Sequence, residues 1–191
     1  MEHIFSYLAE GFDLPILDWL RANIACGFLD GVMPVITMLG DAGIFWIALA
    51  LVLMIIPRTR KIGISMGAAL VIGLVACNLT LKPLMARMRP YDYQLTHFGK
   101  TISLLVATPH DYSFPSGHTI ASFEGAVVLF LYNRKWGIPA LILAGLIAFS
   151  RLYLYVHYPT DVLASLGLAV GIAFLAKWAV EKGCSRLKKT L

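Results

Sequence analysis

The sequence predicts an all-α membrane protein, a compact bundle of five or six transmembrane helices with an N-terminal amphipathic segment. Two observations support this prediction. Of the 191 residues, 59% are hydrophobic and only 14% are charged, whereas about 25% of the residues of a typical soluble domain are charged. The charges are also clustered, and long uncharged stretches separate the clusters. A water-soluble globular domain is therefore excluded.

Residues 1–41 are the least regular part of the pattern. Apolar residues alternate with charges at near-helical spacing, and no uncharged run approaches the ~18 residues of a membrane span. We therefore expect one or two amphipathic helices on the outer surface. A sixth, irregular span that places the N-terminus inside is the alternative, and Asp18, Arg21 and Asp30 argue against it.

Five spans are expected to follow, and the clusters of charge define their ends. The first two form a helical hairpin around the basic cluster that begins at Arg58, and a polar segment, 82–117, precedes the third. The expected spans are 42–57, 62–81, about 118–133, 136 to about 151, and 159–177. We therefore expect one domain over 1–191, with a catalytic bundle at 42–181 and a basic tail at 182–191.

The basic residues predict the orientation of this bundle. Ten of them fall on one side of the membrane, against the single acid Glu181: Arg58, Arg60, Lys61, Arg134, Lys135, Lys177, Lys182, Arg186, Lys188 and Lys189. The positive-inside rule makes this side cytoplasmic, together with the C-terminus. Segments 82–117 and 151–161 then face outward. The net charge of +5 is a signal of topology and does not indicate a nucleic-acid partner.

Three polar clusters lie at the outer ends of the expected spans. They are Lys82-x6-Arg89-Pro90, Pro115-Ser116-Gly117-His118 and Ser150-Arg151-x5-His157-x3-Asp161. Each has a purely structural explanation: interfacial cations such as Arg87, a helix cap at Ser116, or an acid in a first helical turn at Asp161. However, adjacent helices of a small bundle bring their outer ends close together, so we expect the three clusters to converge.

The converged groups have the chemistry of a phosphate site. Lys82, Arg89 and Arg151 supply positive charge, and an arginine can hold two phosphate oxygens at once. A two-metal phosphatase needs several carboxylates, and only Asp161 and Asp111 are near, so no metal ligands are predicted. The sequence also has no nucleotide-type Gly loop, and we expect no cofactor.

The three clusters resemble the three-part signature of the type 2 phosphatidic acid phosphatase and vanadium haloperoxidase superfamily. Its form is KxxxxxxRP, PSGH and SRxxxxxHxxxD, and all eleven specified positions match within residues 82–161. The membrane topology agrees with the membrane lipid phosphatase branch. The first full span of the larger bacterial members is replaced here by the amphipathic segment.

The resemblance implies catalytic roles for three residues. His157 would be the nucleophile that forms a phosphohistidine intermediate, and Asp161 would accept its other ring N–H. His118 would be the general acid. The phosphate oxygens would be held by Lys82, Arg89, Ser116, Gly117 and Arg151. The active site would then lie at the outer membrane–water interface.

Two features are not part of the signature. Glu124 is an acid well inside a span, so it must face the bundle interior or a wet cavity; it has either a structural partner or a role near the substrate head group. Segment 108–114, with His110 and Asp111, leads into the second cluster, and we expect a loop over the pocket.

A lipid phosphate or diphosphate, which can enter the interfacial pocket from the bilayer, is the expected substrate. The compact size resembles the small bacterial undecaprenyl-diphosphate phosphatases. Phosphatidylglycerophosphate and phosphatidic acid are the alternatives within this class. A haloperoxidase is disfavoured because such relatives are mostly soluble. A non-catalytic lipid-phosphate binding or transfer protein is disfavoured because it would need only the cations, whereas His157, His118 and Asp161 are also present. The sequence leaves the oligomeric state open.

Overall fold

Helices account for every regular element in the part of the chain that the computed structural model describes, residues 2–190, with side chains described for 3–185. The side chains of Arg186, Lys188 and Lys189, on which part of the predicted basic tail rests, lie outside the described residues. In order, the elements are α1 (Glu2–Leu8), η1 (Ala9–Asp13), α2 (Leu14–Asn23), α3 (Gly27–Met38), η2 (Asp41–Gly43), α4 (Ile44–Ile55), α5 (Arg60–Gly73), η3 (Leu74–Leu81), α6 (Lys82–Met85), α7 (Pro90–Phe98), α8 (Gly117–Tyr132), α9 (Arg134–Tyr153) and α10 (Pro159–Thr190).

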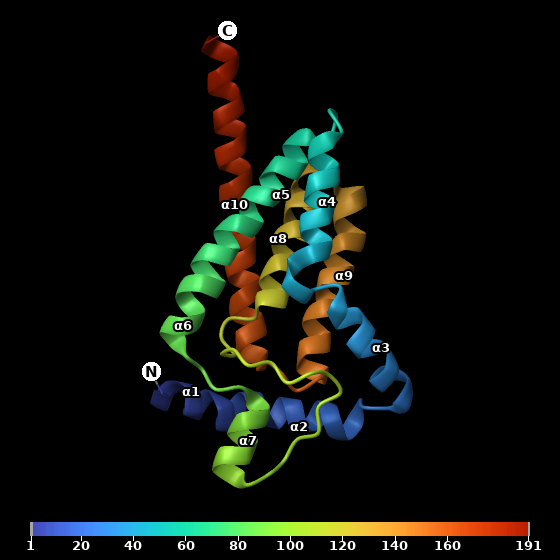
Figure 1. Ribbon diagram of the computed structural model, residues 1–191, viewed down its shortest axis with the longest axis vertical. Coiled ribbons are helices and arrows are strands. Elements are labelled where there is room, and N and C mark those ends of the chain that lie inside the picture. The colour runs from blue at the N-terminus through green and yellow to red at the C-terminus, as the bar shows by residue number, and fades with distance from the viewer. Residues whose placement is uncertain (1, 191) are drawn as a thin grey trace.

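Five helices form the bundle, and α8 lies at its centre. Helix α8 packs against α4, α5, α9 and α10, which run along the long axis of the molecule in Figure 1. Trp46, Met66, Val128 and Ile147 are among the buried residues of this core. The indole N–H of Trp46 donates to Ser122 Oγ at 3.0 Å, so its polar atom is satisfied inside the bundle.

The predicted membrane spans are confirmed as helices at the expected places. Within the described part of the chain, four helical stretches are long and apolar enough to cross a membrane: Gly27–Ile55, Arg60–Phe98, Arg134–Tyr153 and Pro159–Ser185. The third predicted span is the shorter apolar helix α8. The chain is a multi-pass membrane protein.

Local signals in the sequence explain where these helices begin and end. Helix α4 ends before Ile56, which is extended because Pro57 follows it. The side chain of Asn133 caps α9 by accepting from the Lys135 N–H at 3.0 Å. Pro159 opens α10, where a missing N–H costs nothing. The α4–α5 and α8–α9 turns lie at the same end of the bundle (Figure 1), as the predicted basic clusters require.

The N-terminal segment differs in part from the expected surface helices. Residues 2–23 form one irregular helical stretch, α1–η1–α2, that lies across the end of the bundle away from the basic turns (Figure 1). Helix α3, by contrast, packs against α9 and leads through η2 into α4. Its apolar residues belong to the stretch Gly27–Ile55, which exceeds the ~18 residues of a span only when both helices are counted.

A second hydrophobic core joins this segment to the rest of the chain. It includes Leu17, Met33, Tyr91, Tyr155 and Val156, which come from the N-terminal helices, α7 and the α9–α10 turn. Helix α7 ends at Gly99, whose φ of +64° is the left-handed conformation that glycine adopts without strain. The chain between Gly99 and α8 then winds across the same end of the bundle (Figure 1).

Candidate functional site

A cavity of about 890 Å³ opens at the end of the bundle where the three polar clusters meet. Its wall includes six of the eight predicted site residues: Lys82, Arg89, Gly117, His118, Arg151 and His157. They come from α6, the residue before α7, the start of α8, the last turn of α9 and the α9–α10 turn. The three clusters therefore converge in the structure, as the sequence predicts.

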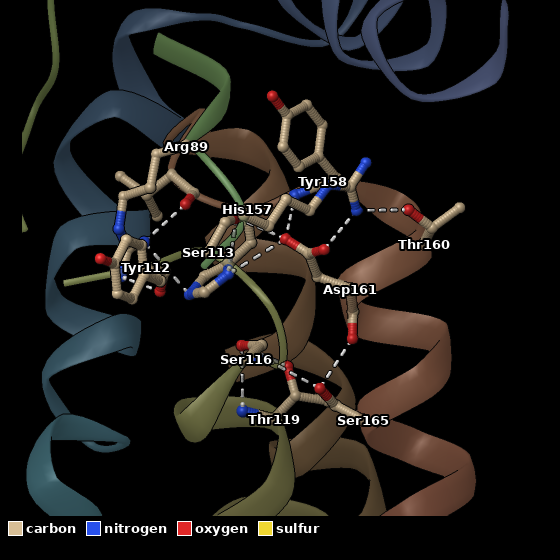
Figure 2. Close-up of polar contacts among 12 residues, drawn as sticks. Arg89, Tyr112, Ser113, Ser116, Thr119, His157, Tyr158, Thr160, Asp161 and Ser165 are labelled. Atoms are coloured by element: carbon tan, nitrogen blue, oxygen red, sulfur yellow. Dashed lines mark hydrogen bonds and ion pairs between the residues drawn. The ribbon is translucent and has the colours of Figure 1, made fainter. Parts of the chain in front are cut away.

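His157 is buried, and its two ring nitrogens face different groups (Figure 2). Its Nε2 lies 3.3 Å from Arg89 Nη1, which can only donate, so Nε2 is the unprotonated nitrogen. Its Nδ1 lies 3.5 Å from both Asp161 Oδ2 and Ser113 Oγ. Burial lowers the pKa of His157, and the positive charges of Arg89 and Arg151 lower it further. The imidazole is therefore neutral.

Asp161, behind His157, is held by three donors. Its Oδ2 accepts from Ser113 Oγ at 2.5 Å and from the Tyr158 N–H at 3.1 Å, and its Oδ1 accepts from the Arg87 guanidinium. Figure 2 shows the contacts of this carboxylate with the Ser113 side chain and with the backbone nitrogen of Tyr158. Such fixed donors orient the acid toward His157. Asp161 thus lies beside the His157 Nδ1, as predicted, but their separation of 3.5 Å is longer than a normal hydrogen bond.

Arg87 continues the chain of contacts to the N-terminal helices. Its Nη2 lies 2.7 Å from Asp13 Oδ2, and both side chains are buried. Asp13 also accepts from the backbone N–H of Thr160 at 2.9 Å. The guanidinium stacks on the Tyr158 ring at 3.8 Å. A buried series of charges, Asp13–Arg87–Asp161, therefore connects η1 to His157.

Lys82 and Arg89 share one carboxylate, that of Asp111. Lys82 Nζ lies 2.5 Å from Asp111 Oδ2, and Arg89 Nη2 lies 2.5 Å from Oδ1. Partial burial alone would raise the pKa of Asp111, but the hydrogen bond from Lys82 and the charge of Arg89 hold it below its usual range. The ionised carboxylate thus contacts both cations, one oxygen to each. The predicted loop over the pocket contains this residue.

Ser116 is placed differently from the other predicted phosphate ligands. Its Oγ accepts from the Thr119 N–H at 3.5 Å and from Thr119 Oγ1 at 3.0 Å, as an N-cap of α8. Its own backbone N–H donates to Ser165 Oγ at 2.8 Å (Figure 2). Ser116 is fully buried, whereas Gly117 lines the cavity. The N–H groups of Gly117 and His118 at the start of α8 have no partner within the helix and are available to an anion.

Glu124 lines the same cavity, deeper in the bundle. Its side chain is buried, and no hydrogen-bonding partner reaches either oxygen among the residues that the structure describes. Gly73 on α5 provides the space, because a Cβ there would collide with the carboxyl group. A structural partner was one of the two explanations for Glu124, and none is found among those residues.

Several residues of the site were not identified from the sequence. Ser113 and Asp13 contact the groups behind His157, Thr37 accepts from Arg151 Nη1 at 2.6 Å, and Asp41 contacts His118. They lie in α3, the N-terminal segment and an irregular loop, where no periodicity relates them to the three clusters. The sequence indicates no more for Arg87 than an interfacial cation. The one available signal is its position between Lys82 and Arg89, inside the first cluster.

The comparisons with known proteins agree with this geometry. Residues 59–183 match the family model described as the PAP2 superfamily. The chain is 36% identical over 167 residues to an undecaprenyl-diphosphatase of Sulfolobus acidocaldarius, covering 87% of this chain and 77% of the relative. An undecaprenyl-diphosphatase of Bacillus subtilis is 34% identical over 147 residues, or 77% of this chain and 72% of the relative.

A solved structure is similar over almost the whole chain. The transmembrane PAP2 type phosphatidylglycerolphosphate phosphatase from Bacillus subtilis has a TM-score of 0.69 and 26% sequence identity, covering 94% of this chain and 93% of that one. The matched family segment contains all three polar clusters. The chain therefore belongs to the PAP2 superfamily, as one of its membrane-embedded lipid phosphatases.

Proposed function

We propose that this protein removes a phosphate group from a lipid phosphate or diphosphate through a phosphohistidine intermediate on His157. The observation that carries this proposal is the environment of the two ring nitrogens. His157 lines the cavity, its Nε2 lies beside Arg89, and its Nδ1 faces Asp161, which is fixed by its own donors. A neutral imidazole with one unprotonated nitrogen at a cation-lined cavity is an activated nucleophile.

In the first step, the Nε2 lone pair of His157 attacks phosphorus, and the bond to the bridging oxygen breaks. The electron pair leaves with that oxygen, which takes a proton from His118. In the second step, water attacks the phosphohistidine and gives a proton to the now neutral His118. The N–P bond breaks, and its electron pair returns to Nε2. Asp161 stabilises the positive charge on the ring between these steps.

Lys82, Arg89, Arg151 and the amide of Gly117 would bind the phosphate oxygens, and Ser116 would hold that amide in place as the cap of α8. These fixed positive groups stabilise the charge that spreads over the oxygens in the transition state, where most of the rate enhancement in phosphoryl transfer arises. The reaction needs no metal or cofactor. The phosphate would displace Asp111 from Lys82 and Arg89.

The site would lie at the outer surface of the cell membrane, with the C-terminus in the cytoplasm. The support is the charge distribution, since the basic turns are at the opposite end of the bundle from the cavity. We further propose one functional domain over 1–191, in which 42–181 form the catalytic bundle and 1–41 and 182–191 flank it.

Undecaprenyl diphosphate is the substrate that we favour, with undecaprenyl phosphate as the product. The names of the two relatives support this choice. The cavity wall also includes Ile47, Leu70 and Leu74, apolar side chains suited to a lipid tail. Phosphatidylglycerophosphate is the second candidate, because the similar solved structure is that of a phosphatidylglycerolphosphate phosphatase.

Phosphate release from a matched panel of polyprenyl and glycerolipid phosphates tests this proposal. We expect the wild-type protein to prefer the polyprenyl diphosphate, to remain active in excess chelator and to be inhibited by vanadate, which mimics five-coordinate phosphorus. The His157→Ala variant should be inactive and remain folded. A preference for glycerolipids would overturn the substrate, and near-wild-type release by His157→Ala would overturn the mechanism.

A further inference from the structure

Asp41 makes a direct contact with the proposed general acid. Its Oδ1 lies 2.7 Å from Nε2 of His118, and both residues line the catalytic cavity. The two are separated by 77 positions in the sequence and come from the α3–α4 turn and the start of α8. The family signature that identified His118 contains no partner for it. The site thus has a second histidine–carboxylate pair, separate from His157 and Asp161.

The backbone of this turn is shaped to bring Asp41 to the ring. Ala42 has φ +50° and Gly43 has φ +66°, so two successive residues adopt the left-handed conformation. At Gly40, a Cβ would lie 2.7 Å from His118 Cδ2 and 2.8 Å from Ile147 Cγ2. Only glycine allows the turn to approach the ring this closely. The pairing therefore depends on a specific backbone arrangement and not on a chance rotamer of a surface acid.

The charges around His118 give this contact a chemical consequence. A general acid must carry its proton when the substrate binds. Burial of the ring and the positive charges of Arg151 and Lys82 disfavour a protonated imidazole. The hydrogen bond to Asp41 and its negative charge oppose both effects. Because Asp41 contacts Nε2, the ring keeps Nδ1 for the leaving group of the substrate.

We infer that Asp41 is the positioning residue of the general acid: it orients the His118 ring and stabilises its protonated form. This inference rests on the proposed function. When the P–O bond breaks, the electron pair goes to the leaving oxygen, and the Nδ1 proton of His118 moves to that oxygen. His118 becomes neutral and keeps the proton on its Nε2, which remains hydrogen-bonded to Asp41. In hydrolysis of the phosphohistidine, the water proton returns to Nδ1.

This role has an observable that a merely structural contact lacks, which is the dependence of the rate on the leaving group. A long-chain alkyl monophosphate needs a proton on its leaving oxygen, whereas 4-nitrophenolate is stable without one. Losing Asp41 should therefore slow the alkyl substrate and change the 4-nitrophenyl phosphate rate little. A general distortion of the site would slow both substrates alike.

The experiment measures the first turnover of both substrates by wild type, Asp41→Asn, His118→Ala and the double variant. Asp92→Asn, an exposed acid on α7, is the matched control. We expect Asp41→Asn to lower the alkyl phosphate rate by about 10-fold or more, part of the ~10²- to 10⁴-fold that general acid catalysis contributes. In the His118→Ala background, Asp41→Asn should have no further effect, because its only route to the reaction has been removed.

Three outcomes would overturn the inference. Asp41→Asn could behave like Asp92→Asn, it could slow both substrates by the same factor, or it could raise the rate, which would mean that Asp41 restrains His118. Failure of the proposed function has a different signature. In that case His118→Ala would retain the wild-type rate on the alkyl substrate, or the wild-type protein would release no phosphate from either.

Discussion

Single side chains at this site have roles that their neighbours determine. His157 and His118 are both imidazoles in the wall of one cavity. His157 faces Arg89 with its unprotonated nitrogen, whereas His118 faces the carboxylate of Asp41. Cations favour a neutral ring and a carboxylate favours a protonated one. Asp41 therefore distinguishes the environment of His118 from that of His157, as the different roles proposed for the two rings require.

Asp111 should act as an internal competitor of the phosphate. Replacing it with Asn removes a negative charge from between Lys82 and Arg89. At about 4 Å through water, a unit charge is worth roughly 1 kcal/mol, so vanadate should inhibit Asp111→Asn at an about fivefold lower concentration. The measurement is the vanadate inhibition constant, with Asp92→Asn as the control. Weaker inhibition of Asp111→Asn than of wild type would show that Asp111 instead positions the two cations.

The residues of the three clusters could be predicted from the sequence because their spacing is fixed along short segments. Lys82 and Arg89, or His157 and Asp161, lie within a few turns of one another. Asp13, Asp41 and Ser113 reach the same site from distant segments. Nothing in a single sequence relates an acid in an irregular turn to a histidine 77 residues away. Only the three-dimensional arrangement identifies these contacts.

At the scale of elements, the N-terminal helices are part of the catalytic end and not a passive surface layer. The stretch α1–η1–α2 lies across that end (Figure 1), and the second hydrophobic core packs it against the α9–α10 turn that carries His157. Asp13, in η1, is fully buried against Arg87. The charges in residues 1–41 made this segment look purely amphipathic, because a buried charge pair cannot be told from two surface charges in the sequence.

The Asp13→Asn substitution should therefore affect both stability and catalysis. Breaking a buried ion pair costs about 3–5 kcal/mol, and Arg87 would lose one of the two carboxylates that hold it behind Asp161. The midpoint temperature of thermal unfolding in detergent and the kcat should both fall. Asp92→Asn is the control, since Asp92 is exposed on α7 and an exposed charge contributes at most ~1 kcal/mol. Equal behaviour of the two variants would contradict this account.

At the scale of the whole molecule, one end of the bundle provides chemistry and the other provides orientation. The cavity, the three clusters and the N-terminal helices share one end, whereas the basic turns at Arg58 and Arg134 lie at the other (Figure 1). Long uncharged runs made the spans predictable, since hydropathy and length determine them. The division of Gly27–Ile55 into two helices was not predictable, because it depends on left-handed residues at the α3–α4 turn.

Trapping of the covalent intermediate tests the central claim, that His157 receives the phosphate, most directly. The protein is mixed with undecaprenyl diphosphate carrying a radiolabelled terminal phosphate and quenched rapidly in alkali. The account predicts an acid-labile label on the peptide that contains His157, and no label on the His157→Ala variant. A label that persists on His157→Ala, or a wild-type protein that turns over without acquiring one, would contradict it.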